Sequence, residues 1–177
     1  MLRFFRFCLL TFGSALLLAG CCANEACDCQ DARADALYFR FLIDDAGTNA
    51  QAFRSSEVDT VWVLRYALPL NSSARHDSIS LVRPGTRASE LFVLDNNRPF
   101  SLVSGRKLHN YEYELRFRDR SRALRRFRVA NINLDGDFEG DGCCTCYVNR
   151  RKTAEVNGRA YTLTETDRQP VIITLTQ

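Results

Sequence analysis

Residues 111–118 read Tyr-Glu-Tyr-Glu-Leu-Arg-Phe-Arg, and they form the most regular stretch of this 177-residue chain. Apolar and charged side chains alternate without a break, so Tyr111, Tyr113, Leu115 and Phe117 share one side of an extended chain. Successive side chains of a β-strand point to opposite faces, and strict alternation is therefore typical of a strand with one buried face. The stretch predicts a strand in a sheet that covers a core.

The same period-two pattern continues outward in both directions, in short segments that turn-forming residues separate. Further strand segments are predicted at 37–43, 58–68, 78–82, 90–94, 125–134, 144–150, 153–163 and 171–176. Trp62 lies inside one of these patterns and is expected in the core. A change of parity after Val129 indicates a β-bulge near Ala130. Asn157-Gly158 predicts a two-residue hairpin turn of type I′.

No amphipathic helix of any length interrupts this pattern, so the chain is predicted to be all-β. Eight or nine short strands at regular spacing predict an antiparallel β-sandwich of immunoglobulin-like kind, with a small closed β-barrel as the alternative. Apolar residues make up 46% of the chain, which is enough for a sizeable core without a cofactor. The length fits a single folded domain.

The first residues have the three-part layout of an export signal. Arg3 and Arg6 supply a positive start, and residues 7–18 form a nearly uncharged apolar run. A run of about a dozen residues is too short to cross a bilayer as a helix, which takes roughly 20. Small residues, Ala19 and Gly20, follow it and lead directly into Cys21.

The leader ends in Leu18-Ala19-Gly20-Cys21, and here the sequence resembles the bacterial lipoprotein family, whose lipobox these four residues match. The resemblance covers the leader alone. It implies that the Cys21 thiol receives a diacylglyceryl group, that cleavage precedes Cys21, and that the new amine is acylated. Two or more acyl chains hold a protein stably on a bilayer, whereas one chain binds only marginally.

The expected organisation is therefore a signal peptide at 1–20, a cysteine-rich tether at 21–36 and a β-sandwich domain at 37–177. The expected location is the cell envelope, with the bilayer as a partner through the Cys21 anchor. In this family an Asp after the lipidated cysteine commonly implies retention in the inner membrane of enterobacteria. Cys22 takes that place here, which favours the outer membrane in a Gram-negative cell.

Six cysteines remain beside Cys21 in the mature chain, in two clusters: Cys22, Cys27, Cys29, Cys143, Cys144 and Cys146. An even number in an exported protein indicates disulfides, since export leaves the reducing cytosol. One cluster precedes the first predicted strand and the other lies beside a late strand, so at least one bridge is expected between them. The alternative is a metal-binding lipoprotein, in which thiolates of both clusters hold Zn²⁺ or Cu⁺.

A second metal hypothesis concerns residues 133–142, where acidic residues occupy alternate positions between glycines. The spacing of Asp135, Asp137 and Asp141 resembles the opening of an EF-hand loop and makes them candidate Ca²⁺ ligands. The position that needs a bidentate Glu holds Cys146, and no helices flank the stretch. The competing interpretation is a glycine-rich, solvated connection between two strands.

Charge gives no general case for nucleic acid binding. Removing residues 1–20 takes away Arg3 and Arg6, which leaves 22 basic residues against 21 acidic ones. Seven arginines crowd residues 116–128, and Glu112, Glu114 and Asp119 lie close to them in sequence. This segment is predicted to be a solvated strand face with balanced charge, in preference to a patch for an anionic glycan or lipid headgroup.

His76 and His109 are the two histidines, and they lie in separate predicted loops. The chain has no Gly-x-Ser-x-Gly, no His-Glu-x-x-His and no phosphate-binding loop. The sequence therefore predicts a non-enzymatic binding or structural domain, with an envelope hydrolase as the least supported alternative.

Overall fold

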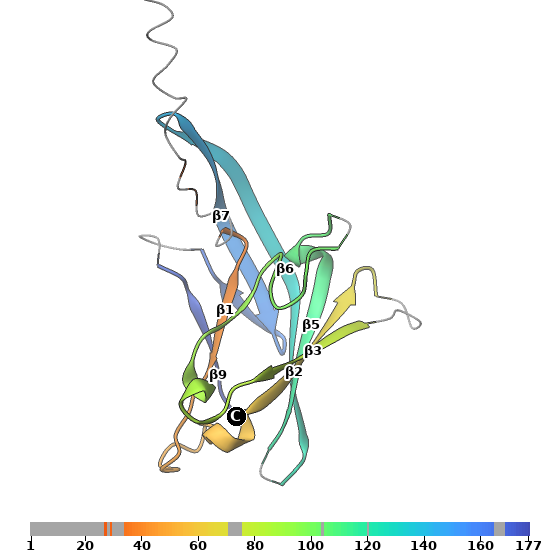
Figure 1. The fold of residues 1–177 in the computed structure, drawn as a ribbon, viewed down its shortest axis with the longest axis vertical. Helices are drawn as coiled ribbons and strands as arrows, with labels where there is room; N and C mark the ends of the chain where they lie inside the picture. The colour runs from red at the N-terminus through yellow and green to blue at the C-terminus, as the bar shows by residue number, and fades with distance from the viewer. Residues whose placement is uncertain are drawn as a thin grey trace, which may run out of the picture.

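A computed structural model describes Cys27, Cys29 and residues 34–70, 76–103, 105–119, 121–164 and 169–177, without the side chain of Asp141. Two sheets make up the fold, as Figure 1 shows. The larger sheet has the order β3 (His76–Val82), β2 (Thr60–Ala67), β5 (Tyr111–Arg118), β6 (Leu124–Asp141), β7 (Cys144–Val156) and β8 (Arg159–Thr162). The smaller sheet has the order β4 (Phe92–Leu94), β1 (Leu37–Phe41) and β9 (Ile172–Leu175).

The described chain also forms three short 3-10 helices, η1 (Ser55–Glu57), η2 (Gly85–Ser89) and η3 (Leu108–Asn110). The nine strands confirm the predicted all-β sandwich, and the sheets do not close into a barrel, because β3, β8, β4 and β9 each pair with a single neighbour among the described strands. No helix in the described ranges is long and apolar enough to cross a membrane.

β5 carries the alternation on which the fold prediction rests. Tyr111, Tyr113, Leu115 and Phe117 are all buried, and the strand pairs antiparallel with β2 on one side and β6 on the other. A strand paired along both edges leaves no backbone donor or acceptor row exposed, so it suits the middle of a sheet. The prediction is confirmed.

The smaller sheet brings the two ends of the domain together. β1 pairs parallel with β9, with Tyr38 opposite Ile172 and Phe41 opposite Leu175, and antiparallel with β4. Leu37, Phe39 and Phe41 point inward and are almost completely buried. Parallel partners need a long connection, and here that connection is the whole of the larger sheet.

Aromatic rings fill the space between the sheets. The Phe41 ring lies 5.6 Å from Phe53, 5.7 Å from Phe92 and 5.5 Å from Phe117, measured between ring centroids. Such pairs contribute about 0.5–1.5 kcal/mol each beyond the area they bury. Trp62 is not part of this core and is 41% exposed, so that prediction is wrong. Val61 and Val63 take the inner face of β2, and alternation then turns Trp62 outward.

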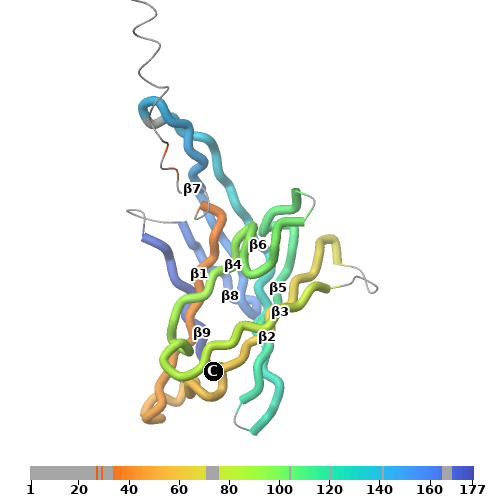
Figure 2. Tube along the Cα trace, in the orientation of Figure 1, coloured from red at the N-terminus to blue at the C-terminus, as the bar shows by residue number. Residues whose placement is uncertain are grey.

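β6 and β7 form a long hairpin whose tip projects past the ends of the other strands (Figure 2). The predicted bulge is confirmed: the β6–β7 register shifts between Ala130 and Asn133, and Asn131 has φ 50°. The type I′ turn between β7 and β8 is also confirmed, since Asn157 and Gly158 both have positive φ, 50° and 82°.

Residues 135–141, expected as a connection between strands, belong to β6 itself, which is a correction. At Gly136 the phenol of Tyr147 on β7 comes so close to the backbone that a Cβ would collide with it. This contact explains why a glycine occupies a strand position. The segments 144–150 and 153–156 likewise form one continuous strand, β7, without a break between them.

Candidate functional site

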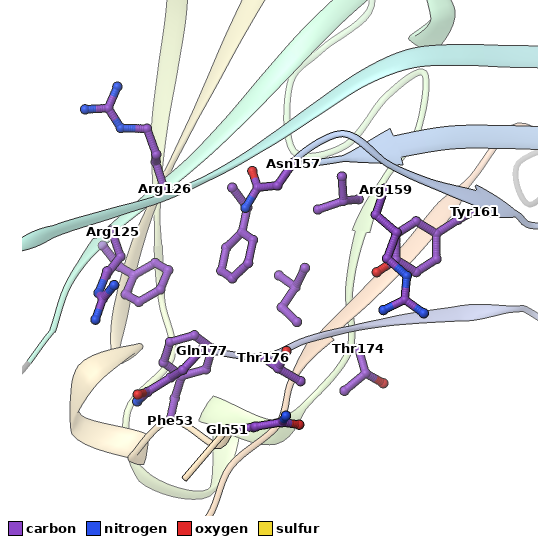
Figure 3. A pocket seen from close by; sticks show the side chains of 14 residues that line it. Gln51, Phe53, Arg125, Arg126, Asn157, Arg159, Tyr161, Thr174, Thr176 and Gln177 are labelled. Carbon is purple, nitrogen blue, oxygen red and sulfur yellow. The ribbon is translucent and has the colours of Figure 1, made fainter.

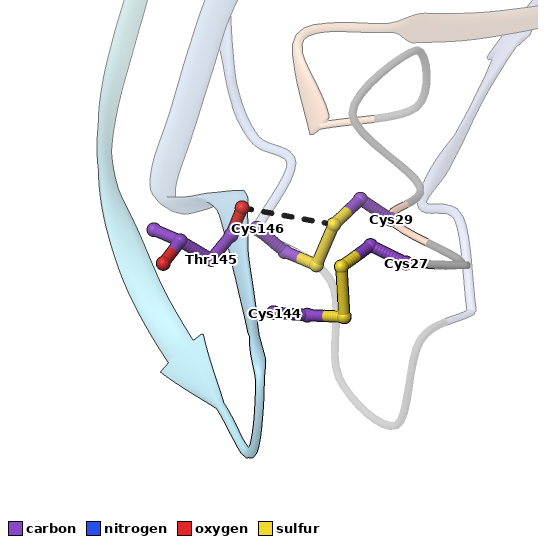
Figure 4. Close-up of a disulfide and its surroundings, with 5 residues drawn as sticks. All are labelled: Cys27, Cys29, Cys144, Thr145 and Cys146. Carbon is purple, nitrogen blue, oxygen red and sulfur yellow. Dashed lines mark hydrogen bonds between the residues drawn. A yellow bond between two sulfur atoms is a disulfide. The ribbon is translucent and has the colours of Figure 1, made fainter. Parts of the chain in front are cut away.

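The first candidate site is the tip of the β6–β7 hairpin, where two disulfides attach the N-terminal segment. Cys27 is bonded to Cys144 and Cys29 to Cys146, with Cα–Cα separations of 5.5 and 5.2 Å (Figure 4). Cys27 and Cys29 are two residues apart in the sequence, and so are Cys144 and Cys146. On β7 this spacing puts Cys144 and Cys146 on the same face. The predicted bridging between the two clusters is confirmed.

The remaining cysteines are only partly described. Cys143 also takes part in a disulfide, and Cys21 and Cys22 lie outside the described residues. A sulfur in a disulfide is not a thiolate, so the bonded cysteines cannot serve as Zn²⁺ or Cu⁺ ligands in this form. Within the described ranges no group of three or more His, Cys, Asp or Glu side chains is placed to hold a metal ion. The thiolate hypothesis is therefore wrong for the oxidised protein.

Polar contacts fix the chain immediately after the bridged segment. The Asp35 carboxylate is buried and accepts hydrogen bonds from the side-chain amides of Asn96 (3.1 Å) and Asn149 (3.0 Å). Lys152, also buried, donates from Nζ to the Ala36 carbonyl at 3.0 Å. Asp35 and Ala36 therefore belong to the folded domain, although residues 21–36 were predicted as tether.

Tyr147 joins this cluster from β7. Burial, and then the nearby Asp35 carboxylate, raise the pKa of its phenol. On one side its ring meets Phe138 edge-on at 5.5 Å, and Lys107 Nζ lies 5.2 Å from the ring centroid. Phe138 itself is 66% exposed at the hairpin. The hairpin end thus combines disulfides, a buried polar cluster and an exposed aromatic ring.

The acidic stretch does not have the geometry of a calcium loop. Asp135, Asp137 and Asp141 all belong to β6, where positions two apart are separated by roughly 7 Å. The side chains of Asp135 and Asp137 therefore run parallel along one face instead of converging. Asp137 lies 3.7 Å from Arg150 and Glu139 lies 3.3 Å from the same guanidinium. The loop geometry on which the calcium hypothesis rested is wrong, because strand pairing with β7 extends through the stretch.

The arginine-rich segment is a charge-balanced strand face, as predicted. Glu114 accepts two hydrogen bonds of 2.9 Å from Arg116, and these bonds hold the pKa of the Glu114 carboxyl below its usual range. Arg128 lies 2.6 Å from Glu112 across the β5–β6 pair. Arg125 lies 2.9 Å from Asp119 in the turn between these strands.

The second candidate site is a cleft of about 460 Å³ between the two sheets. Figure 3 shows Arg125 and Arg126 on one side of it, Arg159 and Tyr161 on the other, and Thr174, Thr176 and Gln177 along the smaller sheet. Five apolar side chains form its inner wall: Phe53, Phe117, Phe127, Val156 and Leu175. Its volume falls in the range of about 300–1,000 Å³ typical of small-molecule sites.

Sequence reasoning missed this cleft, because its lining comes from β5, β6, β7, the β7–β8 turn, β8, β9, the two residues after β9 and the segment before η1. No local pattern joins these segments. The one sequence signal was the parity of the arginine-rich strand, which places Arg125 on the same side as Phe127.

The two histidines are not brought into a catalytic arrangement. His76 begins β3, where its ring lies 5.2 Å from Tyr66, and His109 is exposed in η3. Within the described chain neither imidazole hydrogen-bonds to a serine, threonine or cysteine side chain.

Comparison with known proteins adds no family to this description: no family model matches the chain, and no curated protein and no solved structure is significantly similar to it.

Proposed function

We propose that this protein is a lipid-anchored cell-envelope protein whose β-sandwich is a non-enzymatic binding module, held close to the bilayer by disulfides. The leader and Leu18-Ala19-Gly20-Cys21 support the anchor, and Cys22 at the next position favours the outer membrane where a cell has one. The described disulfides support an oxidising compartment, which the envelope outside the cytosol provides.

One observation carries the proposal, namely that the disulfides join the segment just after Cys21 to the tip of the β6–β7 hairpin. Cys27 lies six positions after Cys21 in the sequence, and a fully extended chain of that length spans about 20 Å at most. An acylated Cys21 would therefore keep Cys144 within roughly that distance of the membrane surface. The anchor would act on the hairpin directly and not through a long free linker.

The cleft supports binding in preference to catalysis. The described residues that line it supply guanidinium, amide, hydroxyl and aromatic groups, and none of them is Asp, Glu, His, Cys or Lys. Guanidinium and amide groups donate hydrogen bonds to a bound ligand, whereas general acid–base chemistry most often uses His, Asp or Glu, which this lining lacks. Tyr161 is the one lining residue of a type that also serves as a general acid or base.

The anchor is tested by growing cells with an alkynyl fatty acid and following the label on the purified protein. We expect the wild-type chain and the Cys22→Ser variant to carry the label and the Cys21→Ser variant to lose it. Cys22→Ser is the matched control, because it removes a neighbouring thiol and leaves the acylation position intact. Label on Cys21→Ser equal to wild type, or an unacylated mature N-terminus by mass spectrometry, would overturn the proposal.

A further inference from the structure

We propose that the cleft between the sheets binds a small organic anion with an apolar body, its acidic group at the arginine rim and its body against the aromatic wall. This goes beyond anchoring and gives the binding module a site and a ligand class.

The inner wall explains the apolar part of the ligand. Phe53, Phe117 and Phe127 belong to the ring cluster of the core, with Phe117 and Phe127 stacked at 6.0 Å and 20° between planes. Val156 and Leu175 complete the wall from the two sheets. Phe127 is half-buried, whereas the other four wall side chains expose at most 5% of their surface. The body of the ligand would therefore rest mainly on Phe127, and it gains roughly 25 cal/mol for each Å² of apolar surface that it buries there.

The rim of the cleft accounts for the acidic group of the proposed ligand. Arg125 and Arg159 line the cleft, and no described lining residue carries an acidic side chain. Arg126 also borders the cleft, but its guanidinium points away from it (Figure 3). Asp119 already pairs with Arg125, and Arg126 lies 3.8 Å from Glu114, which is engaged more closely by Arg116. These two arginines are therefore partly neutralised.

Arg159 is the arginine best placed to take a ligand. It is exposed on β8, and within the described residues it lies within 4.0 Å of no carboxylate. Its guanidinium carbon lies 5.2 Å from the Tyr161 ring centroid, and this contact orients the fork without using its donors. A guanidinium with its donors unused matches a carboxylate, sulfonate or phosphate oxygen pair.

The position of the cleft relative to the hairpin tip indicates the side from which a ligand would reach it. Cys144 begins β7 at the hairpin tip and Val156 ends the strand at the cleft, a run of about 40 Å at the usual rise per residue. The two sheet edges beside the cleft, β8 and β9, each pair with one described neighbour. The inference that the ligand arrives from the aqueous side of the envelope rests on the proposed anchor; the binding site itself does not.

The test uses the full chain in lipid nanodiscs with 4-phenylbutyrate as the probe and 4-phenylbutanamide as its neutral match. Saturation-transfer NMR titrations, with empty nanodiscs subtracted, give an apparent Kd for each. We expect saturable binding of the acid and weaker binding of the amide. Arg159→Gln should weaken the acid about threefold to fivefold, the effect of one exposed ion pair, and change the amide less than twofold.

Two further variants make the result decisive. Thr176→Trp places a bulky ring at the mouth of the cleft and should weaken both probes at least fivefold. Arg151→Gln removes an exposed arginine of β7 that does not line the cleft, and should change neither. Circular dichroism confirms that each variant is folded.

Absence of saturable binding, equal loss of acid and amide in Arg159→Gln, or no effect of Thr176→Trp would overturn the inference. A chain that carries acyl label on Cys21 and fails this titration loses the ligand site and keeps the anchor. A chain without label is titrated in buffer, where binding would keep the site and remove the anchor.

Discussion

Arg65 shows how a charged residue can belong to the core of this protein. It is 6% exposed, and its guanidinium carbon lies 4.5 Å from the ring centroids of both Phe100 and Tyr111. Its Nη2 lies 2.6 Å from Asp77 on β3, and Nη1 donates to the Ser101 carbonyl at 3.3 Å. One planar group thus stacks between two rings and still satisfies its donors.

We expect Arg65→Lys to lower the free energy of unfolding by about 1–2 kcal/mol. The ammonium of a lysine cannot both stack between two rings and donate the paired hydrogen bonds that a planar guanidinium gives to Asp77. Arg116→Lys is the control, since Arg116 pairs with Glu114 on the more exposed face and should lose less than about 1 kcal/mol. Urea denaturation measures both. Equal losses for the two variants would contradict the role given to the rings.

Asp44 gives the stability of the domain a dependence on pH. Its carboxylate accepts hydrogen bonds from the backbone N–H of Asn49 and the hydroxyl of Thr48, and these bonds lower its pKa to about 2. An unfolded Asp titrates near 3.9, so the folded state holds this proton less tightly. Its contribution to stability is complete above about pH 4 and is lost as the pH falls towards 2.

Asp44→Asn should therefore be less stable than wild type at pH 6, and the difference between their urea midpoints should shrink as the pH falls from 4 to 2.5. Asp59→Asn is the control, because the Asp59 carboxylate makes no hydrogen bond within the described chain, and no such trend is expected for it. A difference that stays constant with pH would mean that the Asp44 hydrogen bonds do not depend on its charge.

At the scale of the elements, alternation predicted the strands that have one buried face. β1, β2 and β5 lie within one or two residues of their predicted ends, because burial of every second side chain leaves a readable pattern. The turn at Asn157-Gly158 was equally readable, since few residues other than Asn and Gly accept its two positive φ angles.

The hairpin of β6 and β7 was predicted less well, and its glycines are the reason. Gly136 indicated a turn from sequence, but it serves the close approach of Tyr147 from the neighbouring strand. A contact between residues 11 positions apart leaves no local signal at either one. The projecting part also has both faces largely in solvent, so the alternation of buried side chains is missing there.

The candidate sites depend still more on long-range pairing. That Cys27 and Cys29 meet Cys144 and Cys146 follows from the antiparallel hairpin bringing the tip of β7 beside the N-terminal segment. The even number of cysteines, divided between two clusters, predicted bridges between the clusters. It could not choose among the possible pairings. The cleft was unpredictable for the same reason, since its walls come together only when β1 pairs with β9 and closes the smaller sheet over the larger.

At the scale of the whole molecule, the disulfides enclose nearly the entire domain. Each described bridge joins residues 117 positions apart, and a cross-link that closes such a loop stabilises by about 5 kcal/mol in the chain-entropy model. The two bridges close almost the same loop. Once one is present, the other encloses only a few additional residues and should contribute no more than about 2 kcal/mol.

Removing one bridge with Cys29→Ser and Cys146→Ser should therefore cost at most about 2 kcal/mol, whereas reducing every disulfide of the wild-type chain should cost up to about 5 kcal/mol. Urea denaturation with and without a phosphine reductant measures both losses, and Cys27→Ser with Cys144→Ser is the matched variant. If either pair variant lost as much as full reduction, the bridges would not share one loop. The contacts of Asp35 and Lys152 do not depend on the sulfurs, so the reduced protein should keep its sheets while losing the fixed path from anchor to hairpin.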